Sequence, residues 1–171
     1  AILATDMACH ATHVKELTEI AAETRGIESV QLVQTILHLA DLSNPVQPFD
    51  ISRRWAQCVV AEFKAQAAKE RQLGLPPTEA YLHLETDEDI AKLQLGFIDV
   101  IAAPFWRTAA LLLPGAKLRI EVLELNRAAW QRARESTIEN AAREHESARR
   151  KSPALAAAEA DIDARERVAA E

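Results

Sequence analysis

The chain has 171 residues, of which 49% are apolar and 27% charged, so it is long enough for one packed core and too apolar for a disordered segment. Its net charge of −6 argues against a nucleic-acid partner, and no apolar run approaches the roughly 20 residues of a membrane span. Only four glycines, among many Ala, Leu, Glu and Arg residues, favour an all-α fold. Two cysteines, Cys9 and Cys58, are too few for a disulfide framework, which is consistent with a cytoplasmic location.

The first two predicted helices cover residues 2–23 and 29–42, where apolar residues recur at helical spacing. The expected packing stripe of the second consists of Val30, Val33, Ile36, Leu37 and Ala40. In the first helix, His10 and His13 are three residues apart and are compatible with a shared metal ion. We favour instead the interpretation that His10 and His13 are surface or half-buried histidines that hydrogen-bond carboxylates.

A single carboxylate, Asp41, follows the apolar part of the second helix. Ser43, Asn44 and Pro45 then end the helix, since Ser and Asn hydrogen-bond nearby backbone and a proline disfavours helical geometry before it. Apolar residues flank Asp41 on both sides, and burying an unpaired charge is costly, so we expect a cation, a set of donors or a metal beside it. Two alternatives remain open, in which Asp41 caps a following helix or pairs with a nearby arginine.

A third helix is predicted over residues 50–73, with an apolar stripe of Ile51, Trp55, Val59 and Phe63. Residues 75–86 read as an irregular loop, and two helices follow within residues 87–113, with Pro104 at the start or kink of the second. A charged helix begins at Lys117. The Ala/Glu/Arg-rich stretch 136–171 is expected to be solvated helix or disordered, with coiled-coil packing as a further alternative.

Gln94 and Phe97 lie three residues apart, so both face one side of their predicted helix. A carboxamide offers one acceptor and two donors to a purine edge, and an aromatic ring one turn away can stack on the same base. The alternative is a buried glutamine that hydrogen-bonds backbone beside a core phenylalanine. The residues alone leave both interpretations open.

Three ordered motifs carry a resemblance to a known family. Residues 38–45 read HLADLSNP, residues 2–10 read ILATDMACH, and residues 94–99 read QLGFID, followed by a P-x-W at residues 104–106. They resemble the H-x-A-D-[LI]-S-N-P, I-L-A-T-D-M-x-x-H and Q-x-G-F-I-D motifs of class I 3′,5′-cyclic nucleotide phosphodiesterases. The resemblance covers residues 1–135 and corresponds to the C-terminal half of that catalytic domain. It implies a multi-helix array of the HD-like metal-hydrolase fold, with residues 136–171 as a tail.

The resemblance implies hydrolysis of 3′,5′-cyclic nucleotides to 5′-nucleotides, in signal transduction, with two metal ions activating a shared water. Asp41 would be the one metal ligand of this chain, to a tighter Zn²⁺, with Mg²⁺ or Mn²⁺ as the second ion. Asp6 and His10 would orient the polar network behind the metals. Asn44 favours cAMP over cGMP, because an asparagine can serve the amino edge of adenine. The residues implied to bind substrate are Gln94, Phe97, Asn44, Met7, Leu42, Val59 and Trp55.

The family's H-N-x-x-H-A-x-D and H-D-x-x-H motifs, which carry the general-acid histidine and the other metal ligands, do not occur in this sequence. No catalytic residue is therefore assigned here. We expect a fragment that is inactive alone, with the N-terminal half of the domain and a cyclic nucleotide as partners and a homodimer as an open alternative. A non-catalytic helical module that binds nucleotide or protein is the competing hypothesis. The chain also departs from the family at residues 66–68 (QAA for Q-G-D) and 78–83 (TEAYLH for S-P-x-x-D-R), where the family folds a loop over the pocket mouth.

Overall fold

The computed structural model describes residues 5–23, 26–78 and 81–151, and every regular element among them is helical. The all-α fold predicted from composition is confirmed. The elements in chain order are η2 (Met7–Cys9), α1 (His10–Ala22), α2 (Ser29–Asp41), η3 (Asn44–Val46), α3 (Phe49–Gln72), α4 (Asp87–Phe97), η5 (Ile98–Ala102), α5 (Ala103–Leu112), η6 (Pro114–Ala116) and α6 (Lys117–Lys151).

The chain divides into two units, Ala1–Ala133 and Arg134–Glu171. In the second unit, the described residues belong to the later part of α6, where Arg143 and Glu139 form an exposed ion pair of 3.3 Å. Residues 136–151 of the predicted tail are therefore helical, and the rest of that tail lies outside the described residues.

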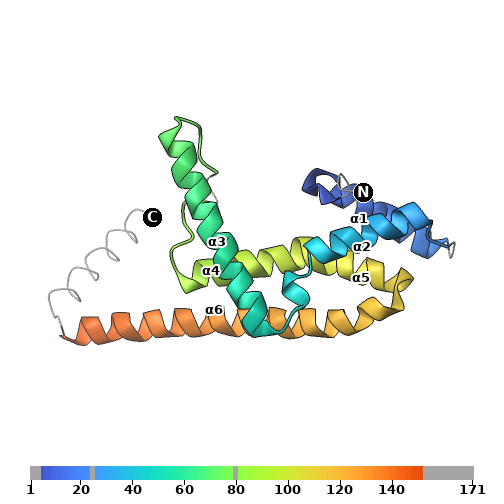
Figure 1. Cartoon of the computed structure of the whole chain (residues 1–171). Helices are drawn as coiled ribbons and strands as arrows, with labels where there is room; N and C mark the ends of the chain where they lie inside the picture. Colours follow the sequence, from blue (N-terminus) through green and yellow to red (C-terminus); the bar gives the residue numbers. More distant parts are fainter. Residues whose placement is uncertain (1–4, 24–25, 79–80, 152–171) are drawn as a thin grey trace, which may run out of the picture. The chain divides into compact units, whose positions relative to one another are not determined.

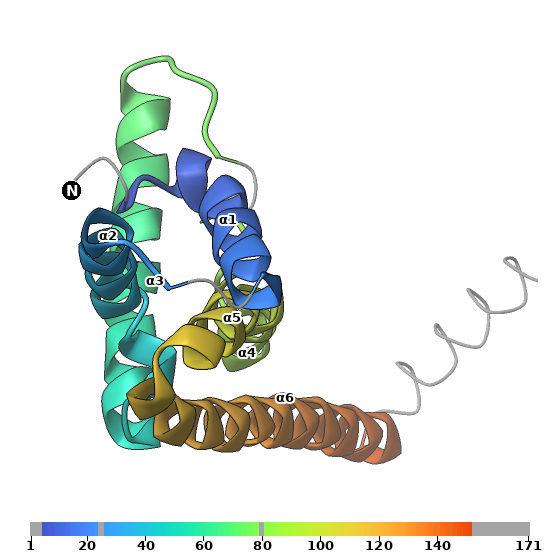
Figure 2. The same ribbon diagram turned by 90° about the vertical axis from the view of Figure 1, so that its right-hand side faces the viewer.

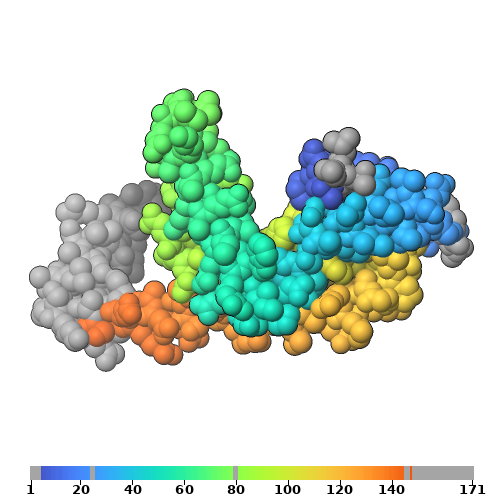
Figure 3. All heavy atoms as spheres, viewed as in Figure 1, coloured from blue at the N-terminus to red at the C-terminus, as the bar shows by residue number. Residues whose placement is uncertain are grey.

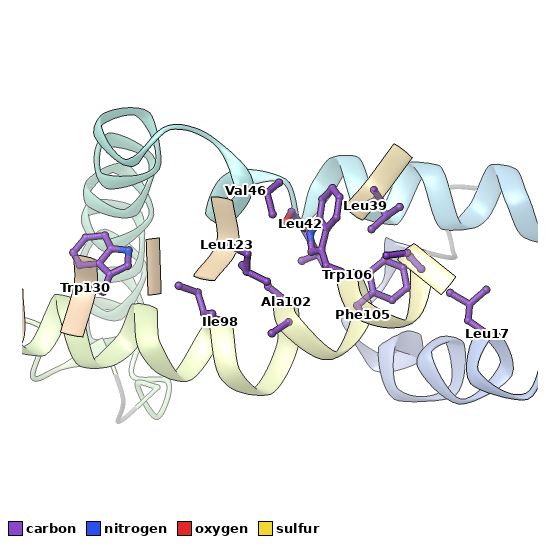
Figure 4. Packing of buried hydrophobic residues seen from close by; sticks show 14 of the residues in the cluster. Leu17, Leu39, Leu42, Val46, Ile98, Ala102, Phe105, Trp106, Leu123 and Trp130 are labelled. Carbon is purple, nitrogen blue, oxygen red and sulfur yellow. Dashed lines mark hydrogen bonds between the residues drawn. The ribbon is translucent and has the colours of Figure 1, made fainter. Parts of the chain in front are cut away.

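The first unit is built on α4, η5 and α5, which run on from one another (Figures 1 and 2). Both α1 and α2 contact α5, and α3 contacts α4. Figure 4 shows the buried side chains that these helices and the start of α6 bring together. The largest side chains in this core are Leu17, Ile20, Ile98, Phe105, Trp106, Leu123 and Trp130.

A π-helical turn, Ile98–Ala102, joins α4 to α5 immediately before Pro104. Proline has no N–H to donate and its ring crowds the carbonyl four residues earlier, so a wider turn at this place accommodates it. The predicted break at Pro104 thus takes the form of a π turn rather than a loop. Arg127 in α6 reinforces this turn through a two-pronged ion pair with Asp99, with N–O distances of 2.6 and 2.9 Å.

The combined helix Asp87–Leu112 is, by length and composition, the one described stretch that could cross a membrane, with a mean hydropathy of 1.4. Its inward side chains, among them Ile98, Phe105 and Ala109, are fully buried in the first unit. The buried share of the apolar window is 39%, and that share belongs to the core of this unit.

The predicted packing stripe of α2 is wrong, because it faces outward. Val30, Val33 and Ile36 are 67%, 51% and 51% exposed, whereas the buried positions are Thr35, His38 and Leu39. In α3 the buried face is likewise displaced by one residue from the predicted stripe. Its buried members are the small or short side chains Ser52, Ala56, Val60 and Ala67.

The N-terminal prediction of one helix over residues 2–23 is also wrong. Among the described residues, a 3-10 turn precedes α1, and Asp6 caps it by accepting the Ala8 N–H through Oδ1 at 2.9 Å. A short carboxylate that hydrogen-bonds the backbone two residues on competes with continuous helix. Residues 2–4 lie outside the described residues.

Candidate metal and nucleotide site

An open hollow of about 490 Å³ lies where α2 ends, η3 turns and α3 begins. Figure 3 shows the molecular surface hollowed between α2 and α3. Three of the predicted site residues line it together, namely Asp41, Asn44 and Trp55. The remaining lining residues are Ala40, Ser43, Gln47 and Ile51.

Asp41 is the last residue of α2 and its side chain is exposed, so the burial expected from its apolar neighbours is wrong. The carboxylate forms no hydrogen bond or ion pair with any residue that the structure describes. It does not cap the next turn, because the N-cap of η3 is Ser43 and that cap makes no side-chain hydrogen bond. Within the described residues, therefore, Asp41 neither caps a following helix nor pairs with an arginine. Its carboxylate lies at the hollow without a hydrogen-bond or ion-pair partner.

Asn44 begins η3 and is half-buried on the wall of the hollow. Its Oδ1 atom is shielded from solvent and has no hydrogen-bond partner. A buried acceptor without a partner is costly, and native structures rarely leave one without a reason. This oxygen is thus an acceptor that the described residues leave unsatisfied at the wall of the hollow.

Trp55 is 57% exposed on the second turn of α3, so it is not part of the core that the described residues form. Together with Ile51, one turn earlier, it supplies an apolar wall to the hollow. A large aromatic surface of this kind suits the face of a flat ring.

The other predicted substrate residues do not line this hollow. Gln94 is buried in α4, and Phe97 is half-buried at the end of the same helix and packs against the core. Val59 is half-buried one turn beyond Trp55, and Leu42 is buried in the core. Met7, in η2, is 47% exposed. The predicted site is therefore divided between the hollow and the faces of α4 and η2.

Three histidines form a buried cluster around the ring of Phe105. The His10 Nδ1 and His38 Nε2 atoms are 2.9 Å apart, and the His13 Nε2 atom is 3.2 Å from the Thr35 hydroxyl. The His38 and Phe105 ring centres are 4.7 Å apart. Burial lowers the pKa of all three histidines below the ordinary value, which favours their neutral form. The expectation of carboxylate partners for His10 and His13 is wrong, because their hydrogen-bond partners are His38 and Thr35.

The described residues contain no group of three or more His, Cys, Asp or Glu side chains placed to bind a metal ion. His38 precedes Asp41 by three residues but is 0% exposed and turned into the core. The carboxylate of Asp41 is a suitable donor for a divalent metal, and a tetrahedral zinc site takes four ligands. The Asp41 carboxylate therefore fits the role of a single metal ligand. A complete site would need further ligands from residues other than those that the structure describes.

The described part of the loop that departs from the family motif, residues 78 and 81–83, contacts α3 in ways that the motifs did not predict. The rings of Tyr81 and Phe63 stack at 4.0 Å with planes 8° apart. Glu70 accepts the Thr78 N–H at 3.0 Å and the Gln66 amide at 2.7 Å. The departures at residues 79 and 80 lie outside the described residues.

Two side chains that the motif analysis did not assign to the site contact its backbone. Trp106 donates its Nε1–H to the Leu42 carbonyl at 3.0 Å, and Asn126 donates to carbonyls at Pro45 and Gln47. Their signal in the sequence is a polar group in a core-facing position, because a buried indole or amide N–H needs an acceptor.

The sequence of this chain is similar to those of known proteins. The model of the family described as 3′5′-cyclic nucleotide phosphodiesterase matches residues 1–123. The rat 3′,5′-cyclic-AMP phosphodiesterase 4C is 35% identical over 76% of this chain and 26% of its own length. The bovine dual specificity calcium/calmodulin-dependent 3′,5′-cyclic nucleotide phosphodiesterase 1B is 36% identical over 60% of this chain and 19% of its own length.

Solved structures with a similar fold are catalytic domains of the same kind of protein. The phosphodiesterase domain of Salpingoeca rosetta rhodopsin phosphodiesterase superposes with a TM-score of 0.76 and 27% identity, over 83% of this chain and 45% of that one. The chain thus spans about a quarter of the rat relative and under half of the crystallised domain. This chain belongs to the 3′,5′-cyclic nucleotide phosphodiesterase family.

Proposed function

We propose that this chain forms the base-recognition part of a phosphodiesterase catalytic domain that hydrolyses 3′,5′-cyclic nucleotides to 5′-nucleotides, with cAMP preferred to cGMP. The observation that carries this proposal is the hollow in which a free carboxylate, an unpartnered amide oxygen and an exposed tryptophan meet. The relatives named for cyclic-AMP or cyclic nucleotide hydrolysis support the substrate class.

In this proposal Asp41 is one ligand of a bound divalent metal, with Zn²⁺ at the tighter position and Mg²⁺ or Mn²⁺ at the weaker one. When bound, such metals polarise the phosphate and lower the pKa of water, which supplies a nucleophile near neutral pH. His10 contributes indirectly, because its hydrogen bond to His38 holds the last turns of α2, which carry Asp41. Asp6 caps η2, the turn that directly precedes His10.

Asn44 is the basis of the proposed preference for cAMP. Its unpartnered Oδ1 would accept a hydrogen bond from the exocyclic amine of adenine, whereas guanine presents a carbonyl oxygen at the equivalent edge. Gln94 and Phe97 act in this proposal as the reader and the stacking clamp of the base, as the family resemblance implies. Trp55, Val59, Leu42 and Met7 complete the surroundings of the nucleotide.

The remainder of the catalytic domain is the proposed partner of this chain. The general-acid motif and the other metal-binding motifs are absent from the sequence, and more than half of the crystallised Salpingoeca domain has no counterpart here. The outward face of α2, with Val30, Val33 and Ile36 exposed beside Asp41, is the surface that those missing helices would cover. We therefore propose that the isolated chain is inactive.

A non-catalytic nucleotide-binding module is the second candidate. It is favoured by the replaced loop at residues 78–83 and by the incomplete metal-ligand set of the described residues. A cytoplasmic location and a homodimer also remain proposals. Cell fractionation tests the location, and light scattering of the purified protein tests the dimer.

Hydrolysis by the longer protein that carries this chain tests the proposed function. We expect metal-dependent cAMP hydrolysis that a chelator abolishes and Mn²⁺ or Zn²⁺ with Mg²⁺ restores, and no hydrolysis by residues 1–171 alone. In the active protein, Asn44→Ala should lower the cAMP to cGMP preference by about tenfold, the value of one good base contact. Absence of hydrolysis by the longer protein, with retained nucleotide binding, would establish the non-catalytic module instead.

A further inference from the structure

The backbone immediately after Asp41 is held by a side chain from another helix. Trp106, in α5, donates its indole Nε1–H to the Leu42 carbonyl at 3.0 Å, and both groups are buried. Figure 4 shows the Trp106 ring beside Leu42 within the core. This bond fixes the peptide at the C-terminal end of α2, where the last carbonyls of a helix have no partner inside the helix.

A second side chain holds the other end of the same segment. Asn126, in α6, is only 2% exposed, and its Nδ2 donates to the Pro45 carbonyl at 2.8 Å and to the Gln47 carbonyl at 2.7 Å. One amide group thus bridges two carbonyls within three residues. Asn44, whose Oδ1 has no hydrogen-bond partner among the described residues, directly precedes the first of them.

Arg119, also in α6, donates a longer hydrogen bond of 3.5 Å to the Val46 carbonyl, and the side chains of Pro45 and Val46 are themselves buried. η3 is a single 3-10 turn whose backbone bonds are Val46 N–H to Ser43 O at 3.1 Å and Gln47 N–H to Asn44 O at 3.2 Å. Turns of this kind have poorer hydrogen-bond geometry than an α-helix and are short for that reason. The three bonds that Trp106 and Asn126 donate, at 2.7–3.0 Å, are shorter than the Arg119 bond, so we expect them to contribute most to the placement of this backbone.

We infer that Trp106 and Asn126 are positioning residues that set the placement of Asp41 and Asn44, and through them the metal affinity and base preference of the site. Neither side chain lines the hollow, so each acts through the backbone it holds rather than by contact with a ligand. The functional part of this inference rests on the function proposed above, and the structural part does not.

Amide hydrogen exchange on residues 1–171 tests the structural part. Asn126→Leu removes two donated hydrogen bonds at similar side-chain size, and Trp106→Phe removes one donated hydrogen bond and keeps an aromatic ring. We expect exchange at Val46 and Gln47 to accelerate about tenfold relative to exchange in α1. The matched control is Trp130→Phe, because the buried Trp130 Nε1 has no partner to lose. Equal acceleration in α1, or none in η3, would overturn the inference, even if a variant is less stable overall.

Metal titration of the longer protein tests the functional part. Trp106→Phe and Asn126→Leu should raise the metal concentration for half-maximal hydrolysis about tenfold, with kcat largely recovered at saturating metal. Trp130→Phe should leave that concentration unchanged. An inactive unaltered protein would contradict the proposed function, and the exchange result would still decide the positioning role. An active protein whose variants keep the original metal dependence would contradict the inference alone.

Discussion

α5 and α2 are both amphipathic helices of the first unit, and they use their apolar residues in opposite ways. In α5 the apolar residues Phe105, Trp106 and Ala109 are buried. In α2 the buried face includes two polar side chains, Thr35 and His38, while the valines and an isoleucine face outward. The same kind of pattern thus marks the inside of the unit in one helix and its outside in the other.

This difference teaches what periodicity measures. An apolar stripe identifies a face that is removed from water in the working protein, whatever covers it. For α5 the cover is this chain itself. For α2, we propose that the rest of the catalytic domain packs on the apolar face. On the opposite, buried face, His38 contacts His10 and His13.

The largest expected effect concerns α5. Phe105 is 0% exposed and contacts the rings of all three clustered histidines, so Phe105→Ala should lower the free energy of unfolding by about 3–5 kcal/mol. Urea denaturation measures this change. The control on the same helix is Leu111→Ala. Because Leu111 is exposed, this substitution should change the free energy of unfolding by no more than about 0.5 kcal/mol. Similar values for the two variants would contradict the assigned core.

An intermediate effect is expected from pH through the histidine cluster. Burial lowers the folded-state pKa of His10, His13 and His38 below the unfolded value of about 6.5. Between those two values the unfolded chain binds more protons than the folded one, so stability is full above about pH 7 and falls as the pH drops through about 6.5. The thermal midpoint measured from pH 8 to pH 5 should show this decline.

Two variants sharpen the pH test. His13→Gln removes one member of the cluster and should make the decline shallower. His83→Gln removes an exposed histidine and should leave the decline as it is. A decline of the same steepness in both variants would show that His13 does not contribute to it.

The smallest effect in this chain is expected on the outward face of α2. Val33→Ala should change the stability of residues 1–171 by no more than about 0.5 kcal/mol, because the side chain is half exposed. In the longer protein, where we propose that this face is covered, the same change should cost about 1 kcal/mol or more. Equal small effects in both proteins would remove the argument that α2 is an interface.

The sequence predicts the helical element types well and the buried faces of the helices poorly. Asp41, Asn44 and Trp55 were predicted as site residues and line one hollow, because the helix-ending residues 43–45 place them around a single turn. The inward faces of α2 and α3 were missed because periodicity does not distinguish a surface covered by this chain from one covered by another.

Other features could not be predicted because they depend on tertiary contacts. The pairing of His10 with His38 joins residues 28 positions apart, and the bonds from Asn126 to the η3 backbone join residues about 80 positions apart. The π turn before Pro104 was predictable in part. Pro104 indicates a break in the helix, but the sequence does not show that the break is a π turn. Gln94 and Phe97 still rest on the motif, since they lie outside the hollow.

Our central claim is that the hollow at Asp41 belongs to a metal-dependent cyclic nucleotide phosphodiesterase site. The most direct test compares cAMP hydrolysis by the longer protein with that of Asp41→Asn, which removes one metal-binding charge at nearly constant size. Asp50→Asn is the control, because Asp50 is an exposed carboxylate of α3 that pairs with Arg54 and does not line the hollow. The account predicts a loss of about 100-fold or more for Asp41→Asn and little change for Asp50→Asn. Full activity of the Asp41→Asn variant would contradict it.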